Sequence, residues 1–304
     1  MTLNDDSRDV PRTSMPSPTK DELKLSGGVA VITGAGGGIG SGLARRAAQL
    51  GMTVVIADIA IDRAETVARE IIDAGGQAEA VVVDVSRPDE LDRLAEMVHE
   101  RHGHVRLLVN NAGIETLGLC WEVPAARWEA TLNINIHGIV HGVRAFAPRM
   151  LATGQECWIA NLSSAGAFGM MPTQAAYIMT KHAVQSFTEG LFLDMKTIKA
   201  PVHVCSVIPG LVRTDIFDAT PRPSGGGQNG RMAEFRKIMS DMARDHGMDV
   251  EQASRIIMAQ IAAGKFWVST HPETTDEIIA HRIEFLRQQV DPDVMPGSRH
   301  LVDF

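Results

Sequence analysis

The segment Thr33-Gly34-Ala35-Gly36-Gly37-Gly38-Ile39-Gly40 decides the fold. It follows the apolar run Val29–Thr33, which is typical of a buried strand, and precedes a stretch rich in Ala, Leu and Arg that is typical of a helix. Glycines in a strand–turn–helix unit let the backbone turn tightly and approach a pyrophosphate, whose charge the helix N-terminus stabilises. The order of elements therefore predicts a dinucleotide site. Its candidate residues are Gly34, Gly36, Gly38, Ile39 and Gly40.

Further apolar runs alternate with helical patterns along the chain. The predicted strands are Val29–Thr33, Thr53–Asp58, Ala78–Asp84, Arg106–Asn110, Cys157–Leu162, Val202–Ile208 and Phe266–Ser269. Two of the helical patterns begin with capping-box spacing, Asp62 with Glu65 and Ser86 with Asp89. Runs that are apolar throughout suit strands buried on both faces of a parallel sheet. The prediction is an α/β fold, a Rossmann-type doubly wound parallel sheet of about seven strands with helices on both faces.

The expected domain organisation is one catalytic domain with additions at both ends. Residues 1–26 are polar and proline-containing, which predicts a flexible N-terminal arm. Residues 27–304 form the single Rossmann-type domain, with a C-terminal tail over about 281–304. Residues 215–264 separate the last two strands, and an insertion there lies over the ligand crevice, so we predict a substrate lid. Its stretch Pro221–Gly230 also fits a plain surface loop.

Composition excludes several classes of function. Apolar residues make up 44% of the 304 residues, which is enough for a full core, and the formal net charge of −8 disfavours nucleic acid and anionic membranes as partners. No apolar run is long enough to cross a bilayer and no signal pattern opens the chain, so a cytoplasmic location is expected. The three cysteines are far apart, and His137 and His141 lack a third ligand, so no metal site is expected.

Asp58 ends the second predicted strand and favours NAD over NADP as cofactor. Its carboxylate can accept hydrogen bonds from an adenosine ribose and would repel the extra phosphate of NADP. No Arg or Lys interrupts the glycine turn, and Ile59 follows Asp58. The alternative role for Asp58 is a helix N-cap, which Asp62 fills better on spacing.

Two further strand ends supply candidate cofactor contacts. Asp84 and Val85 end the third strand and can meet the adenine, although an Asp there also opens turns. Asn111, Ala112 and Gly113 follow the fourth strand, where a turn of small residues can border the nicotinamide ribose or stabilise the sheet.

Tyr177, the single tyrosine of the chain, stands four residues before Lys181. On a helix this spacing places both side chains on one face. A neighbouring ammonium stabilises a phenolate and so lowers the pKa of the tyrosine. Tyr177 with Lys181 is therefore a candidate acid/base pair.

Together these motifs resemble the short-chain dehydrogenase/reductase family, in the subgroup with a Gly-x-x-x-Gly-x-Gly turn and Tyr-x-x-x-Lys. The resemblance covers about residues 28–214. It implies that Tyr177 is the general acid/base and that Lys181 lowers its pKa and binds the nicotinamide ribose. The family register selects Ser164 over Ser163 as the donor to the substrate oxygen. It also selects Asn135 over Asn133 as the residue that holds a water linking Lys181 to solvent.

The resemblance extends to the segment after the sixth strand. It implies that Pro209, Gly210, Val212 and Thr214 contact the nicotinamide. In this fold the loops after strands four, five and six form the substrate pocket, and here they are mostly apolar. The candidate lining residues are Trp121, Phe168, Met170, Met171, Ile216 and Phe217. A small hydrophobic secondary alcohol or ketone is the expected substrate.

The leading hypothesis is therefore an NAD-dependent alcohol dehydrogenase. One alternative is an NADPH-dependent carbonyl reductase, which Asp58 disfavours. The other is a non-catalytic dinucleotide sensor, a protein free to lose Ser164, Tyr177 or Lys181, which this chain retains. The family commonly forms homo-tetramers or homo-dimers through helices that correspond to about 125–150 and 173–198, although a buried helix would show the same apolar pattern.

Overall fold

The computed structural model describes residues 18–218, 229–295 and 299. Their strands form a seven-stranded parallel sheet in the order β3-β2-β1-β4-β5-β6-β7. The strands are β1 Val29–Thr33, β2 Thr53–Asp58, β3 Gln77–Val82, β4 Val105–Asn110, β5 Cys157–Leu162, β6 Val202–Ile208 and β7 Trp267–Ser269. The predicted fold class is confirmed. The third strand ends two residues earlier than predicted, at Val82, so Asp84 lies in the loop that follows.

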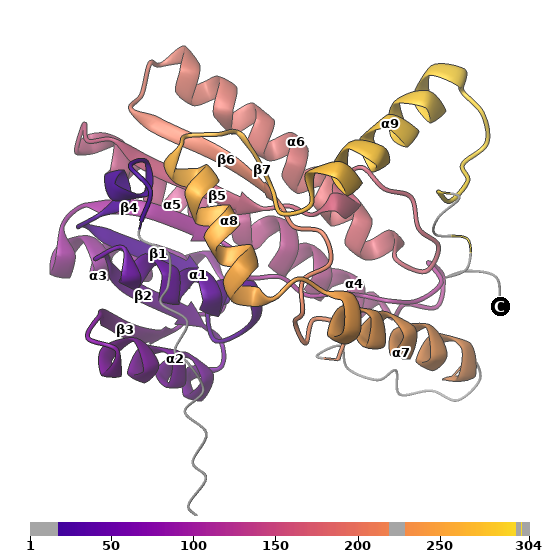
Figure 1. Ribbon diagram of the computed structural model, residues 1–304, viewed down its shortest axis with the longest axis horizontal. Coiled ribbons are helices and arrows are strands. Elements are labelled where there is room, and N and C mark those ends of the chain that lie inside the picture. The colour runs from indigo at the N-terminus through magenta and orange to yellow at the C-terminus, as the bar shows by residue number, and fades with distance from the viewer. Residues whose placement is uncertain (1–17, 219–228, 296–298, 300–304) are drawn as a thin grey trace, which may run out of the picture.

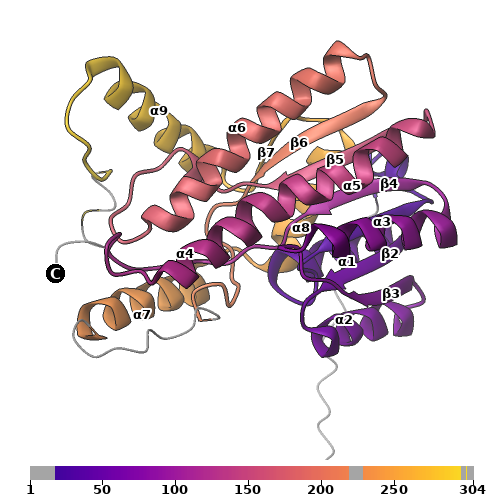
Figure 2. The same ribbon diagram turned by 180° about the vertical axis from the view of Figure 1, so that it is seen from behind.

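Helices cover both faces of this sheet, as Figures 1 and 2 show. One face is covered by α1 (Gly38–Gln49), α2 (Ile61–Asp73) and α8 (Val250–Ala262). The other face is covered by α3 (Pro88–His102), α5 (Gly138–Ala152) and α6 (Ala175–Thr197). The remaining helices are α4 (Ala125–Leu132), α7 (Asn229–His246) and α9 (Pro272–Gln288), with short turns at Glu22–Leu25, Asn133–His137 and Ala165–Ala167. Because all strands run parallel, their carboxyl ends meet at one edge, where a ligand crevice is expected.

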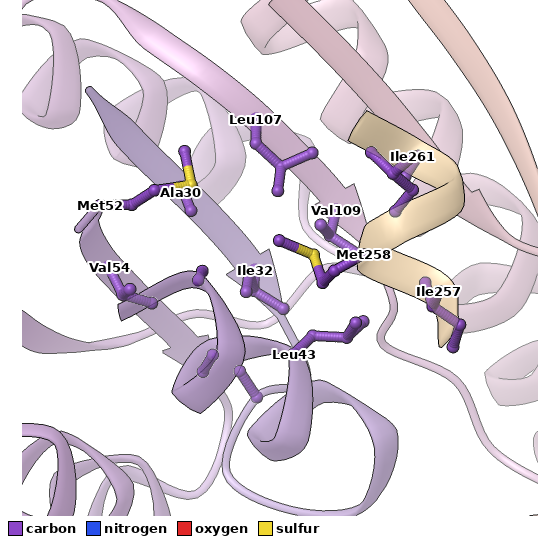
Figure 3. Close-up of a cluster of buried hydrophobic side chains, with 14 of the residues drawn as sticks. Ala30, Ile32, Leu43, Met52, Val54, Leu107, Val109, Ile257, Met258 and Ile261 are labelled. Carbon is purple, nitrogen blue, oxygen red and sulfur yellow. The ribbon is translucent and has the colours of Figure 1, made fainter. Parts of the chain in front are cut away.

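Helix α8 belongs to the core and not to a lid. Its apolar residues Ile257, Met258 and Ile261 are fully buried against β1, β4 and α1, as Figure 3 shows. Burying three large apolar side chains contributes several kcal/mol, by about 1.5–3 kcal/mol each. The predicted lid of residues 215–264 is therefore too long. Only the part before α8, which includes α7, stays a candidate lid, and residues 219–228 lie outside the described residues.

The predicted N-terminal arm is also too long. Leu25 is fully buried in the core, and the Glu22 carboxylate forms an ion pair at 2.6 Å with Arg46 of α1. Both charged side chains are almost completely buried, so each one compensates the desolvation of the other. The chain is thus anchored from about Glu22 onward. Residues 1–17 of the predicted arm lie outside the described residues.

The predicted capping boxes of α2 and α3 are wrong. Helix α2 begins at Ile61 with Ala60 at its N-cap, so Asp62 lies within the first turn. The carboxylate of Asp58 accepts from the Ala60 amide at 2.9 Å, so it stabilises the turn before α2 and is not the N-cap of that helix. Helix α3 begins at Pro88, a favoured first position, and the Ser86 hydroxyl donates to Asp84.

The predicted tail begins inside a helix. Helix α9 continues to Gln288 and leads away from the sheet, as Figure 1 shows. Its side chains are largely exposed; only Thr275 is buried.

Within the described ranges, every helix is too short or too polar to span a membrane.

Candidate active site

A cavity of about 420 Å³ lies at the carboxyl edge of the sheet. It brings together most of the residues that the sequence nominates for a dinucleotide. Those that line it are Gly34, Gly38, Ile39, Asp58, Asp84, Val85, Asn111, Ala112, Gly113, Tyr177, Lys181, Pro209 and Thr214. The β1 and β4 ends thus share one cavity with α6, as the parallel topology requires.

The glycine turn fits closely against the loop after β4. Gly34 has a φ of +65°, and a Cβ there would lie 2.7 Å from the Ala112 Cα. A Cβ on Gly40 would lie 2.5 Å from both the Asn111 side-chain nitrogen and the Gly34 carbonyl oxygen. Side chains at these two positions would therefore collide with the backbone of the turn or its neighbour. The turn fits a nucleotide phosphate because only glycines leave its backbone this accessible.

Asn111 fastens this turn to the fourth strand. Its side-chain nitrogen donates to the carbonyl oxygens of Thr33 at 2.8 Å and Gly34 at 3.0 Å. The Thr33 hydroxyl in turn accepts from the backbone amides of Asn111 and Ala112. Asn111 thus stabilises the central strands while lining the cavity, and both predicted roles are compatible with its position.

Asp58 lies beside the glycine turn, with much of its hydrogen-bonding capacity already used. One carboxylate oxygen accepts from the Gly36 amide at 2.8 Å and the other from the Ala60 amide at 2.9 Å. Asp84 is similar, since it accepts from both the amide and the hydroxyl of Ser86. Both carboxylates still line the cavity. Each therefore combines a turn-stabilising role with a position next to the dinucleotide site.

Arg63 is a cavity residue that the sequence analysis missed. It projects from α2, its Nε lies 3.4 Å from the Gly36 carbonyl oxygen, and its guanidinium occupies the space that a Cβ on Gly37 would need. Arg63 lies neither in the glycine turn nor directly after Asp58, the two places where a cation was expected to bind the phosphate of NADP. A basic residue one helical turn into α2 reaches the same place.

Tyr177, Ser164 and Lys181 come together at the other end of the cavity. Tyr177 and Lys181 lie one turn apart on α6, and the Lys181 Nζ is 5.5 Å from the centre of the tyrosine ring. The Ser164 hydroxyl lies close enough to Tyr177 to lower the pKa of the phenol, and its Oγ accepts from the Gly166 amide at 3.0 Å. Ser163 lines the cavity as well, but its hydroxyl donates to the Lys181 carbonyl oxygen. The geometry thus places Ser164, and not Ser163, against the phenol.

The pKa values differ from the sequence expectation. Burial, together with the negative charge of Glu115, raises the pKa of Tyr177 above its usual value, and the Ser164 hydroxyl opposes this shift. Burial lowers the pKa of Lys181 to about 8, against the opposing effect of Glu115. The Lys181 ammonium donates to the Leu162 carbonyl oxygen at 2.7 Å. The expected lowering of the pKa of Tyr177 by Lys181 is therefore wrong for this structure, because burial dominates.

Asn135 is fully buried in a π-helical turn between α4 and α5. Its side chain accepts from the Ile114 amide at 2.8 Å and donates to the Ile114 carbonyl at 2.9 Å and the Thr180 hydroxyl at 3.1 Å. Asn133 instead bonds to His137 at the surface. The π-helical turn, a feature frequent at functional sites, thus directs Asn135 toward the loop after β4 and α6.

The predicted substrate residues are only partly brought together. Ile216 lines the cavity, whereas Trp121 is 79% exposed and Phe168 packs against the Trp267 ring. Phe217 and Met171 belong to a small apolar cluster with Leu117 and Phe235 of α7. The residues predicted to line the substrate pocket that lie outside this cavity lining are Trp121, Phe168, Met170, Met171 and Phe217.

Four predicted cofactor residues also lie behind the cavity wall. Gly36 and Gly40 shape the turn without lining the cavity, and the Gly210 amide donates to Thr270 at 3.0 Å. Val212 is buried and pairs with Met248 just before α8.

Glu115 and Arg127 were missed, although both line the cavity beside Tyr177. Glu115 lies in the loop after β4 and is only 2% exposed; burial raises its pKa to about 8. Arg127 reaches the cavity from α4, outside the loops in which basic residues were sought. A charged residue within an otherwise apolar loop was the available signal for Glu115. No signal in the sequence indicated the direction of Arg127.

Residues 28–224 match the family model described as short chain dehydrogenase. The chain belongs to the short-chain dehydrogenase/reductase family.

The chain is similar to a solved structure and to two curated proteins. A Burkholderia phymatum short-chain dehydrogenase/reductase, in complex with NAD, is 31% identical, covers 89% of this chain and 99% of its own, and superposes with a TM-score of 0.84. The 1-deoxy-11-beta-hydroxypentalenate dehydrogenase of Streptomyces exfoliatus is 34% identical over 67% of this chain and 74% of that protein. The probable oxidoreductase EphD of Mycobacterium tuberculosis is 33% identical over 72% of this chain, but the match spans only 37% of EphD.

Proposed function

We propose that this protein interconverts a hydrophobic secondary alcohol and its ketone, with NAD as the preferred cofactor and Tyr177 as general acid/base. The observation that carries the proposal is that Tyr177 and Lys181 line the cavity that begins at the glycine turn, with Ser164 next to the phenol. The relative that acts on a hydroxylated pentalenate and the relative in complex with NAD support it.

The roles of the residues follow from their contacts. Bound at the glycine turn, NAD supplies the acceptor for the hydride that leaves the alcohol carbon. Tyr177 takes the hydroxyl proton during oxidation and returns it during ketone reduction. Ser164, which lies next to Tyr177, donates to the substrate oxygen and stabilises the negative charge that develops there. Lys181 holds a positive charge beside the tyrosine ring and contacts the cofactor ribose.

Asn135 contributes by position. It holds both backbone polar groups of Ile114 and reaches Thr180 on α6, so it fixes the loop after β4 against the helix that carries Tyr177 and Lys181. In this proposal a water beside Asn135 connects Lys181 to solvent and carries the proton away.

A second candidate function uses NADP, because Arg63 lies over the glycine turn near Asp58. A guanidinium can hold a phosphate on the adenosine ribose and offset the repulsion from Asp58. The carbonyl reductase hypothesis regains support from this residue. Asp58 still favours NAD. Its carboxylate lies 2.8 Å from the Gly36 amide, whereas the Arg63 Nε lies 3.4 Å from the Gly36 carbonyl oxygen.

The proposal also includes a homo-dimer or homo-tetramer in the cytoplasm, without nucleic-acid, membrane or metal partners, and a lid formed before α8. Sedimentation analysis of the purified protein would test the assembly.

The test of function follows nicotinamide absorbance with NAD or NADP and a panel of secondary alcohols. Hydrophobic aromatic, terpenoid and steroid alcohols are expected to react, with NAD giving the higher kcat/KM. If small polar polyols alone reacted, the substrate class would be wrong. If NADP alone supported turnover, the role given to Asp58 would be wrong.

A further inference from the structure

The cavity holds an arginine that forms no ion pair with the residues that the structure describes. Arg127 is half-buried and lines the cavity together with Glu115, Tyr177 and Ile216. Its Nε donates to the Thr116 hydroxyl at 3.0 Å, and one Nη donates to the backbone carbonyl of Glu115. Both acceptors are neutral. Across residues 18–218, 229–295 and 299, no Asp or Glu lies within ion-pair distance of this guanidinium.

The guanidinium is held in a fixed orientation. The Thr116 hydroxyl that accepts from it shares a 2.6 Å hydrogen bond with Thr131, and the Thr131 hydroxyl donates to the Arg127 carbonyl oxygen at 2.7 Å. Thr116 and Thr131 are both fully or almost fully buried. A donor fixed in this way loses little conformational entropy when a ligand binds. Arg127 is therefore preorganised to present its remaining N–H groups to the cavity.

A second cation stands close to the first. Arg236 of α7 has a buried Nε that lacks a hydrogen-bond partner within the described ranges. Burial lowers the pKa of Arg127 and the positive charge of Arg236 lowers it further, while the Glu115 carboxylate acts in the opposite direction. Two neighbouring guanidinium groups that are partly removed from water are unfavourable unless an anion balances them.

Glu115 completes the chemistry of this end of the cavity. Burial raises the pKa of its carboxyl to about 8, which favours the protonated form. A protonated carboxyl can donate a hydrogen bond and does not repel an anion. The surrounding wall remains apolar at Ile114, Ile134 and Ile216.

We propose that Arg127 binds a carboxylate of the substrate, so that the enzyme acts on a hydrophobic hydroxy acid and the corresponding keto acid. The inference rests on the proposed function, since it places the acid group relative to the carbinol that Tyr177 engages. Arginine and a carboxylate form a bidentate, charge-assisted pair, which fixes orientation as well as affinity. The apolar wall contacts the hydrocarbon part between the two ends.

A purely structural role for Arg127 makes a different prediction. If the guanidinium only tied α4 to the loop of Glu115 and Thr116, its loss would weaken binding of charged and neutral substrates alike. A substrate-binding role instead predicts an effect that depends on the charge of the ligand. Acid and ester forms of one molecule separate the two roles.

The experiment uses two ketone probes, 4-acetylbenzoate and 12-oxostearate, each compared with its methyl ester. Calorimetry measures their binding to the full-length protein with and without NAD, and the matching alcohols are assayed for oxidation. The variants are Arg127→Gln and Arg127→Lys, with the exposed Arg93→Gln of α3 as control. Thermal unfolding is recorded for each variant, so that a loss of folding is recognised.

Arg127→Gln is expected to weaken binding of at least one acid about ten- to a hundredfold and to change ester binding less than about twofold. Arg127→Lys should recover part of the loss, and Arg93→Gln should resemble the unchanged protein. Equal losses for acid and ester would overturn the proposal, as would an unchanged protein that binds neither acid better than its ester.

The two proposals fail in distinguishable ways. Arg127-dependent acid binding without oxidation of any alcohol would contradict the proposed function and leave the carboxylate site standing. If the neutral alcohols and esters were oxidised and the loss of Arg127 changed nothing, the proposed function would be supported and the carboxylate site would be overturned.

Discussion

The two ends of the cavity are built in different ways. The cofactor end depends on backbone geometry: Gly34 and Gly40 pack against the loop after β4, and Asn111 fastens the two together. The substrate end depends on side chains from separate segments: Glu115 after β4, Arg127 on α4 and Ile216 after β6. A backbone constraint leaves a compact local pattern in the sequence. A site assembled from distant side chains leaves no such pattern.

Tyr177 lies where the two ends meet, and its replacement should have the largest effect. Tyr177→Phe removes the proton carrier while keeping the ring, so kcat is expected to fall about 10²–10⁴-fold. Cofactor affinity, measured by the fluorescence of bound NADH, should change little because the glycine turn is untouched. This chain has no second tyrosine to compensate. Activity retained in the variant would mean that the two ends do not meet at Tyr177.

The packing of the glycine turn predicts the next largest effect. Gly40→Ala places a Cβ 2.5 Å from both the Asn111 side chain and the Gly34 carbonyl oxygen. Such overpacking should lower the free energy of unfolding by about 1–3 kcal/mol and weaken NAD binding. The measurements are denaturant unfolding and NADH fluorescence.

Gly190→Ala is the matched control for this substitution. Gly190 lies inside α6, and a Cβ there meets nothing within 4 Å, so alanine should raise stability by up to about 1 kcal/mol through helix propensity. If both variants behaved alike, the close approach at Gly40 would not be the constraint described above.

Arg63 tests whether the cofactor end is as simple as its sequence pattern indicates. Arg63→Ala should lower kcat/KM with NADP by roughly three- to tenfold, because an exposed guanidinium gives only a modest contribution. The kcat/KM with NAD should stay the same. Arg69→Ala, an exposed arginine of the same helix, serves as control. An equal loss with both cofactors would assign Arg63 to the glycine turn itself and remove the support for NADP.

The sequence was sufficient for the fold and for the position of the glycine turn at the carboxyl edge of the sheet. The residues 54–57 of β2 are all apolar because both faces of the strand are covered, and the glycine turn is contiguous, so both leave local signals. Helix α8 was misassigned to a lid because its sequence position, after a long insertion, conceals its packing against α1 and β1. The length of an insertion does not say where its second half returns to the core.

The substrate end could not be predicted to the same extent. Apolar residues after β4 and β5, such as Trp121 and Phe168, satisfied the expected loop positions, but their directions depend on tertiary packing. The pKa values also depend on burial: Tyr177 and Lys181 are shifted chiefly by loss of water, which spacing along a helix does not reveal. Spacing predicts which groups are neighbours, whereas their protonation depends on the surroundings.

Glu115 gives the smallest expected effect and the most direct test of coupling between the two ends. Its carboxyl, with a pKa of about 8, becomes negative at alkaline pH, and that charge raises the pKa of Tyr177. Glu115→Gln removes the charge, so the pKa of Tyr177 should fall. Alcohol oxidation requires the deprotonated tyrosine, and the limb of the kcat/KM profile that rises with pH should therefore move to lower pH, by less than about one unit.

The profile is measured with a neutral alcohol, so that the charge of the substrate does not enter, and Glu122→Gln serves as the exposed control in the same loop. A shift to higher pH would mean that Glu115 acts mainly through Lys181, whose pKa it raises and whose positive charge favours the phenolate. The direction of the shift thus shows whether Glu115 acts mainly on the pKa of Tyr177 or on that of Lys181. If the pH profile of kcat/KM did not shift, Glu115 would not influence the proton transfer at Tyr177.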